Sequence, residues 1–134
     1  MLRGLYTRDG DLELGGSTQG LLSLAKRLMR RGEIQFDLAL STSGVDPTPY
    51  DGVLSRISVK IGGEQPLYIA RTGATLRIEG SRRTVEIFAS NLESLVRQAS
   101  ERANGSVRAH LHVEYYPGHY FLDERSEPLV IAVL

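Results

Sequence analysis

Apolar positions recur along the chain with either the spacing of an α-helix or the strict alternation of a β-strand, and the first part of the chain shows both patterns. Segments 2–7 and 12–14 are short and apolar-flanked, and the Asp9-Gly10 pair between them is typical of a β-hairpin. After residue 16 the apolar positions follow the i, i+3, i+4, i+7 spacing of an amphipathic helix, with Ser17 or Thr18 as N-cap. Gly32 is placed to end that helix. Strict alternation in 33–40 then predicts a half-buried strand.

The middle of the chain predicts a long loop followed by a β-meander. Residues 41–52 are turn-forming and include two prolines, so we expect either a mobile loop or a binding loop. Alternation resumes at 53–62. Three further short strands are expected at 66–71, 75–80 and 84–89.

The last part of the chain predicts a helix and two strands. Ser90 or Asn91 is expected to cap a second amphipathic helix, which Gly105 would end. Segments 107–116 and 128–134 are expected to be strands. Six to eight strands and two helices predict an α+β fold: an antiparallel or mixed sheet with both helices packed on one face, as a two-layer sandwich. The other sheet face would then be open to water or to a partner.

The whole chain, 1–134, is expected to form a single domain. Its two parts, roughly 1–62 and 66–134, also share a pattern, since Glu13 and Ser17 recur 73 residues later as Glu86 and Ser90. The helix stripes align better at a shift of 71. An internal duplication and a resemblance by patterning alone therefore both remain open.

Composition narrows the function classes. The 16 basic and 16 acidic residues cancel, so net charge predicts neither nucleic-acid binding nor membrane attraction. The absence of cysteine excludes disulfides, thiolate zinc sites and a cysteine nucleophile. No apolar run is long enough for a signal peptide or a membrane span, and we expect a soluble, cytoplasmic protein. The pattern leaves the oligomeric state open.

Basic residues gather at the end of the first predicted helix: Lys26, Arg27, Arg30 and Arg31. Positive charge there complements the helix dipole. The alternative is a phosphate-binding patch, but no aromatic residues are interleaved with the cluster and the net charge does not support it.

The segment AHLHVEYYPGHY, residues 109–120, contains all three histidines of the chain. On a strand, His110, His112 and Glu114 would share one side, at a spacing that permits a zinc site. His119 and Asp123 are the candidates for further ligands. The competing hypothesis is a solvated or partner-facing strand, which His-x-His spacing alone does not distinguish from a metal site.

Motifs for catalysis are missing. The chain has no Gly-x-Ser-x-Gly elbow, no phosphate-binding loop and no Gly-x-Gly-x-x-Gly turn. An acid–base pair built from His110 or His112 with Glu114 is chemically possible, but no pattern marks a substrate pocket. The sequence therefore leans towards a protein that is not an enzyme and needs no cofactor.

Aromatic residues cluster just after the histidine strand, as Tyr115, Tyr116, Tyr120 and Phe121 around a Pro-Gly turn. We expect Tyr115 to lie in the core, because it shares its side of the strand with Val113. The others, with acidic residues close behind, would form either an interaction rim or a corner that closes one end of the sheet.

Residues 110–131, HLHVEYYPGHYFLDERSEPLVI, resemble the C-terminal signature of a bacterial immunity-protein family, number thirty-two of the series found beside polymorphic toxins. The positions that carry the resemblance are His110, His112, Glu114, Tyr115, Pro117, His119, Ser126, Pro128, Leu129 and Val130. Residues 12–28 resemble the same family's strand-to-helix passage. The resemblance implies a small cytoplasmic α+β protein without enzymatic activity that binds and blocks a cognate toxin domain.

Together these patterns lead to one main hypothesis and two alternatives. The main hypothesis is a protein-binding module that contacts its toxin through His110, His112, Glu114, Tyr116, His119, Asp123 and Glu124. The first alternative is a metal-binding protein or metal-dependent enzyme using His110, His112, Glu114 and His119. The second is a structural or ligand-binding domain.

Overall fold

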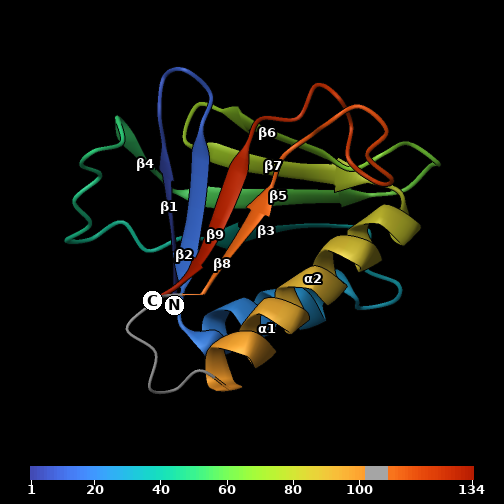
Figure 1. The fold of residues 1–134 in the computed structure, drawn as a ribbon, viewed down its shortest axis with the longest axis horizontal. Helices are drawn as coiled ribbons and strands as arrows, with labels where there is room; N and C mark the ends of the chain where they lie inside the picture. Colours follow the sequence, from blue (N-terminus) through green and yellow to red (C-terminus); the bar gives the residue numbers. More distant parts are fainter. Residues whose placement is uncertain (102–108) are drawn as a thin grey trace.

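Nine strands and two helices are present in the computed structural model, which describes residues 1–101 and 109–134 (Figure 1). In chain order they are β1 (Leu2–Tyr6), β2 (Leu12–Gly16), α1 (Thr18–Leu28), β3 (Gln35–Ala39), β4 (Gly52–Leu54), β5 (Arg56–Ile61), β6 (Tyr68–Thr72), β7 (Thr75–Gly80), α2 (Arg82–Glu101), β8 (His110–Val113) and β9 (Leu129–Val133). Within this described part, no helix is long and apolar enough to cross a membrane.

The strands form two mixed sheets whose strands run crosswise to each other (Figure 1). The five-stranded sheet has the order β4-β1-β2-β9-β8, and the four-stranded sheet has the order β3-β5-β7-β6. The pairs β2–β9 and β5–β7 are parallel, and the remaining pairs are antiparallel. The predicted α+β class and mixed pairing are confirmed. The strands, however, divide between two sheets instead of forming one sheet of six to eight.

Each half of the chain completes the sheet of the other half. In the four-stranded sheet β5 pairs with β7, which joins β3 and β5 to the hairpin of β6 and β7. In the five-stranded sheet β9 pairs with β2, so that β9 and β8 extend the hairpin of β1 and β2. The arrangement β1-β2-β9-β8 thus has the same pairing pattern as β6-β7-β5-β3, and each half has its helix after its second strand. The repeated topology is what a duplication of 1–62 and 66–134 would produce, and the duplication itself stays a prediction.

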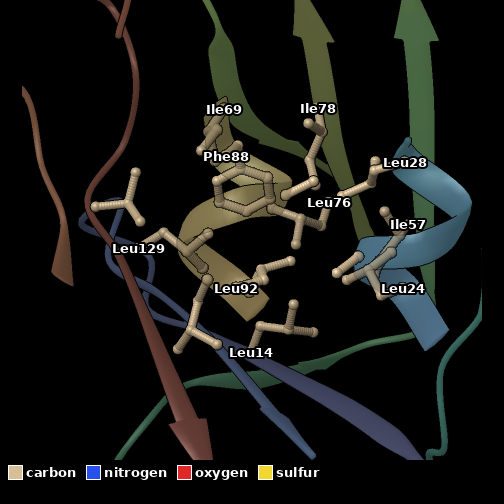
Figure 2. Close-up of a cluster of buried hydrophobic side chains, with 14 of the residues drawn as sticks. Leu14, Leu24, Leu28, Ile57, Ile69, Leu76, Ile78, Phe88, Leu92 and Leu129 are labelled. Carbon is tan, nitrogen blue, oxygen red and sulfur yellow. The ribbon is translucent and has the colours of Figure 1, made fainter. Parts of the chain in front are cut away.

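One cluster of buried side chains lies between the two sheets and the helix pair (Figure 2). Both sheets and both helices contribute to it, through Leu14, Leu24, Leu28, Ile57, Ile69, Leu76, Ile78, Phe88, Leu92 and Leu129 among others. Helices α1 and α2 also pack directly against each other. Full burial of a large side chain such as Phe88 contributes roughly 1.5–3 kcal/mol. Because residues from both halves share this core, the two sheets are fixed relative to each other.

The first helix begins where the sequence predicts but ends at Leu28, with Met29 as C-cap, before Gly32 is reached. Ser17 is its N-cap, with the side-chain oxygen accepting a hydrogen bond from the Gly20 N–H at 3.0 Å. Gly32 follows the helix with φ of +87°, a conformation that other residues rarely adopt.

The second helix begins earlier than predicted. The segment 84–89, expected to be a strand, is the start of α2, and Ser81 caps it in place of Ser90 or Asn91. The Ser81 side-chain oxygen accepts a hydrogen bond from the Thr84 N–H at 3.2 Å. The β-branched and aromatic residues of this segment imitate a strand, but its buried positions continue the helical stripe through Leu92. The predicted end at Gly105 lies outside the described residues.

The alternating segment 53–62 is divided between the two sheets. β4 pairs with β1, and β5 pairs with β3 and β7. Ser55 lies between them, where its N–H donates to the Ala74 carbonyl at 2.8 Å. The chain therefore passes from one sheet to the other at a single residue, which a continuous pattern of alternation does not reveal.

Candidate protein interface

The corner, residues 114–128, connects the edge strand β8 to the central strand β9. Its tip is a tight turn at Pro117-Gly118, closed by the His119 N–H donating to the Tyr116 carbonyl at 2.9 Å. Gly118 has φ of +87°, and proline before such a glycine is typical of a type II turn. The sequence thus fixes the conformation of the tip locally.

The second half of the corner is anchored to the four-stranded sheet. Phe121 and Leu122 are buried in the core cluster. The Leu67 N–H donates to the Phe121 carbonyl, and the Asp123 N–H donates to the Leu67 carbonyl, both at 2.8 Å. The Glu127 N–H bonds to the Ile69 carbonyl at 2.8 Å, so the corner runs beside β6. These hydrogen bonds attach the corner firmly to the four-stranded sheet.

His119 is at the centre of the aromatic cluster. Its ring stacks on Tyr120, with centroids 5.5 Å apart, and meets Tyr116 at 4.6 Å and Phe121 at 4.7 Å. Its Nδ1 accepts hydrogen bonds from the N–H groups of Phe121 and Leu122. Nδ1 must be unprotonated to do so, and burial lowers the pKa of His119. The neutral imidazole therefore organises the aromatic corner.

Three tyrosines of the corner remain in contact with solvent. Tyr115 is 37%, Tyr116 56% and Tyr120 61% exposed. They make up half of the exposed large hydrophobic residues in the described parts of the chain, the others being Met1, Ile34 and Leu134. The prediction that Tyr115 lies in the core is wrong, because β8 ends at Val113 and the strand alternation stops before Tyr115. The solvent-facing aromatic area is thus larger than the sequence predicted.

The remaining predicted site residues lie on β8 or within the corner itself. His110, His112 and Glu114 are exposed, and the register of β8 on β9 puts both histidines on the outer face of the five-stranded sheet. Glu124 is exposed as well. Asp123 has another role: its carboxylate binds the Arg125 guanidinium at 2.9 Å, and that contact lowers its pKa.

The metal hypothesis draws little support from this geometry. His112 Nδ1 lies 3.7 Å from Glu114 Oε1, but His119 is turned into the aromatic cluster and its Nδ1 is already bonded. In residues 1–101 and 109–134 no group of three or more histidine, aspartate or glutamate side chains is arranged to hold a metal ion.

A cavity of about 380 Å³ lies between the corner and the start of α2. His119, Tyr120 and Phe121 line one side, and Arg82 and Arg83 line another. Glu64 lies at the same cavity. A part of a partner that covers Tyr120 would therefore also meet Arg83, which is exposed.

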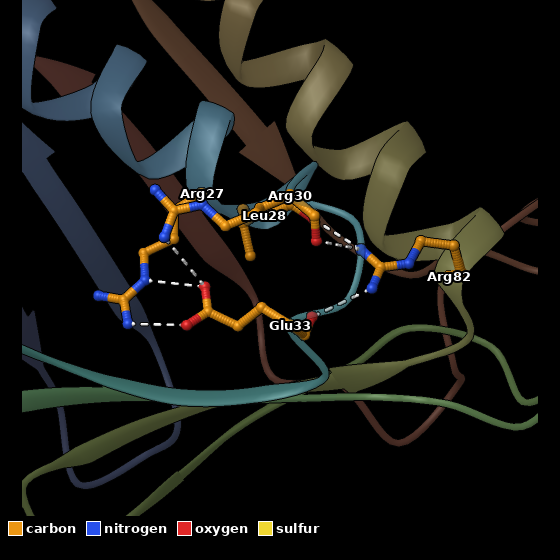
Figure 3. Close-up of polar contacts among 5 residues, drawn as sticks. All are labelled: Arg27, Leu28, Arg30, Glu33 and Arg82. Atoms are coloured by element: carbon orange, nitrogen blue, oxygen red, sulfur yellow. Dashed lines mark hydrogen bonds and ion pairs between the residues drawn. The ribbon is translucent and has the colours of Figure 1, made fainter.

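In the basic cluster at the end of α1, Arg27 and Arg30 form ion pairs with Glu33 (Figure 3). Arg27 forms a two-point contact with Glu33, at 3.1 and 3.2 Å. Arg82 reaches across from α2 and donates to the carbonyls of Leu28, Arg30 and Glu33. These bonds satisfy carbonyls near the C-terminal end of α1. They favour the structural interpretation of the cluster over a phosphate-binding patch.

An ordered aromatic patch on a closed α+β frame is typical of protein-binding modules. The family comparison agrees with this class: residues 75–134, from β7 to the end of the chain, match the family model described as Immunity protein 32. The match confirms the resemblance seen in residues 110–131. Neither a search of curated proteins nor a search of solved structures gave a match.

Proposed function

We propose that this chain is a non-enzymatic immunity protein that binds a cognate bacterial toxin domain and blocks it. The observation that carries the proposal is the ordered, solvent-exposed tyrosine cluster around His119. The family match to an immunity protein points to the same function.

The corner has the physical properties of an interaction centre. Tyrosine offers a large contact area with a hydrogen-bonding tip, and loses little conformational entropy on binding. Here the turn, the backbone bonds to Leu67 and the stacking on His119 restrict the rings before a partner arrives. Tyr116 and Tyr120 are the proposed anchors, with Tyr115, His110, His112, Glu114 and Glu124 around them.

The test is protection of bacterial cells from the toxin encoded beside this gene, together with the affinity of the purified pair. Tyr116→Ser and Tyr120→Ser should each weaken binding by about tenfold or more, as truncation of a central aromatic anchor does. Ile34→Ser is the matched control, because Ile34 is 63% exposed but lies outside the corner.

Unchanged affinity and protection in the Tyr116→Ser, Tyr120→Ser double variant would refute the corner as the binding surface. Failure of the intact protein to bind or protect against any neighbouring toxin would refute the function. A cytoplasmic site of action is part of the proposal, since a chain without cysteine suits a reducing compartment.

A further inference from the structure

The outer face of the five-stranded sheet is partly covered. Leu14 of β2 and Ile131 of β9 pair with each other and belong to the core side. Leu5 pairs with Glu13, and Ala132 with Gly15, each one position along from this pair, so Leu5 and Ala132 point away from the core. Leu5 is nevertheless only 4% exposed and Ala132 3% exposed, and neither belongs to the central cluster. Other parts of the chain must therefore shield this outer face.

The loop 41–51 lies against β1 and is tied to it at both ends. The Ser41 N–H donates to the Leu2 carbonyl and the Asp51 N–H to the Tyr6 carbonyl, each at 2.8 Å. Asp51 also accepts the Arg8 N–H at 2.7 Å. Near its end, Tyr50 is half-buried. The loop predicted to be either mobile or a binding element is thus attached along the edge of the sheet.

A groove of about 260 Å³ lies between this loop, the β1–β2 turn and the start of the corner. Its lining is mostly apolar, with Leu12, Tyr50, Pro128 and Val130 beside the carboxylates of Asp11 and Glu114. The volume is below the range of roughly 300–1,000 Å³ that is usual for small-molecule sites. A single inserted side chain is a better fit than a cofactor.

The charge at the groove is negative. Burial raises the pKa of the Tyr50 phenol, and the negative charges of Glu13 and Asp11 raise it further. Across the described residues, no lysine or arginine lies within ion-pair distance of Asp11, Glu13 or Glu114; the neighbour of Glu114 is His112. Two carboxylates that line the apolar groove, those of Asp11 and Glu114, are therefore exposed and have no lysine or arginine as ion-pair partner among the described residues.

We infer that this groove receives an arginine or lysine side chain of the protein partner. The occupant follows from charge complementarity. The methylene groups of a long cationic side chain can lie against Leu12, Pro128 and Val130. Its charged group can then reach the carboxylates of Asp11 and Glu114. The inference rests on the proposed function as far as the partner is concerned. It explains how a protein with zero net charge can still attract a basic surface.

The experiment uses the intact protein and needs no toxin. A capped Gly-Arg-Gly peptide is titrated and followed by NMR chemical shifts, with the same peptide carrying neutral, nearly isosteric citrulline as its matched ligand. We expect saturable shifts centred on Tyr50, Val130 and Glu114 for the arginine peptide, and at least fivefold weaker binding of the citrulline peptide. The Asp11→Asn, Glu114→Gln double variant should weaken the arginine peptide by about fivefold or more, since it removes two exposed charge contacts.

The control variant Glu93→Gln, Glu101→Gln on α2 changes the net charge equally but leaves the groove intact, and should bind the arginine peptide within about twofold of the original protein. Shifts scattered over the surface, equal binding of both peptides, or equal weakening in both double variants would overturn the inference. The peptide titration does not involve the toxin. If the arginine peptide does not bind in the groove while the protein still binds its toxin, only this inference is refuted. Loss of toxin binding by the intact protein refutes only the proposed function.

Discussion

The two long connections of the fold, 40–55 and 114–128, occupy the same place in the two halves of the chain. Each joins an edge strand to a central strand, β3 to β5 and β8 to β9. Each also runs beside the first strand of its own half, through β4 on β1 and through the bridge between Leu122 and Leu67 next to β6. The first of these contacts is antiparallel and the second is parallel.

The two connections differ in the chemical character of the surface that they expose. The first has a single tyrosine, Tyr50, which is half-buried beside carboxylates, whereas the second exposes Tyr115, Tyr116 and Tyr120. The difference shows that equivalent connections of one fold can carry different chemistry: the first contributes Pro49 and Tyr50 to an apolar groove, and the second exposes an aromatic patch. Loops that a rigid scaffold positions are the usual place for such variation.

The largest expected effect tests whether the two halves of the chain depend on each other to form the two sheets. Fragments 1–64 and 65–134, produced separately, should each fail to fold, because each half's sheet needs two strands from the other half. Circular dichroism and NMR spectra of the fragments check this. Mixing them should restore a folded complex with one cooperative unfolding transition.

A fragment that unfolds cooperatively on its own would contradict the exchange of strands as the basis of the fold. It would also show that the two connections belong to separate domains, against the prediction of one domain over 1–134.

The next effect separates the buried from the exposed part of the corner. Phe121→Ala should lower the free energy of unfolding by about 3–5 kcal/mol, because Phe121 is a buried member of the core. Tyr120→Ala should change it by at most about 0.5 kcal/mol, since its ring is mostly in solvent. Chemical denaturation measures both. A large loss in Tyr120→Ala would mean that the exposed tyrosines stabilise the fold and are less available to a partner.

The elements that the sequence predicted correctly depend on local patterns, whereas the features that it missed depend on contacts between distant segments. The hairpin of β1 and β2, the helix after Ser17 and the strands β6 and β7 follow from spacing and turn chemistry, which are local. The division into two sheets depends on Ser55 and on pairings between β2 and β9 or β5 and β7, far apart in the chain. No local pattern encodes those pairings.

The same distinction applies to the candidate interface. The histidine strand, the Pro-Gly turn and the tyrosines were identified from the sequence, since they lie within one segment. The groove was missed because Tyr50 and Glu114 are distant in sequence and meet only after the sheets assemble. Tyr115 was misplaced because the strand alternation was extended beyond Val113, where β8 ends.

A smaller effect concerns the histidine that organises the corner. Burial lowers the pKa of His119, so below about pH 6.5, the ordinary value for histidine, the unfolded chain binds more protons than the folded one. Stability should therefore fall as pH decreases through that region, by less than the loss in Phe121→Ala. Denaturation at a series of pH values measures it. His119→Asn, whose amide oxygen can accept the same N–H bonds, should be less sensitive to pH.

His112→Asn is the control for this measurement, since that ring is exposed on the outer face and takes part in none of the ring contacts around His119. An unchanged pH dependence in His119→Asn, or its loss in His112→Asn, would assign the effect to another group.

The smallest effect tests the electrostatics of the other connection. The pKa of Tyr50 is raised first by burial and then by Glu13 and Asp11, so Glu13→Gln should let Tyr50 ionise at a lower pH than in the original protein. NMR of tyrosine-labelled protein follows each ring, and Glu93→Gln on α2 changes the net charge equally without being a source of the Tyr50 shift. If Tyr50 titrates identically in both variants, the carboxylates do not act on the groove, and the two connections differ in shape and burial alone.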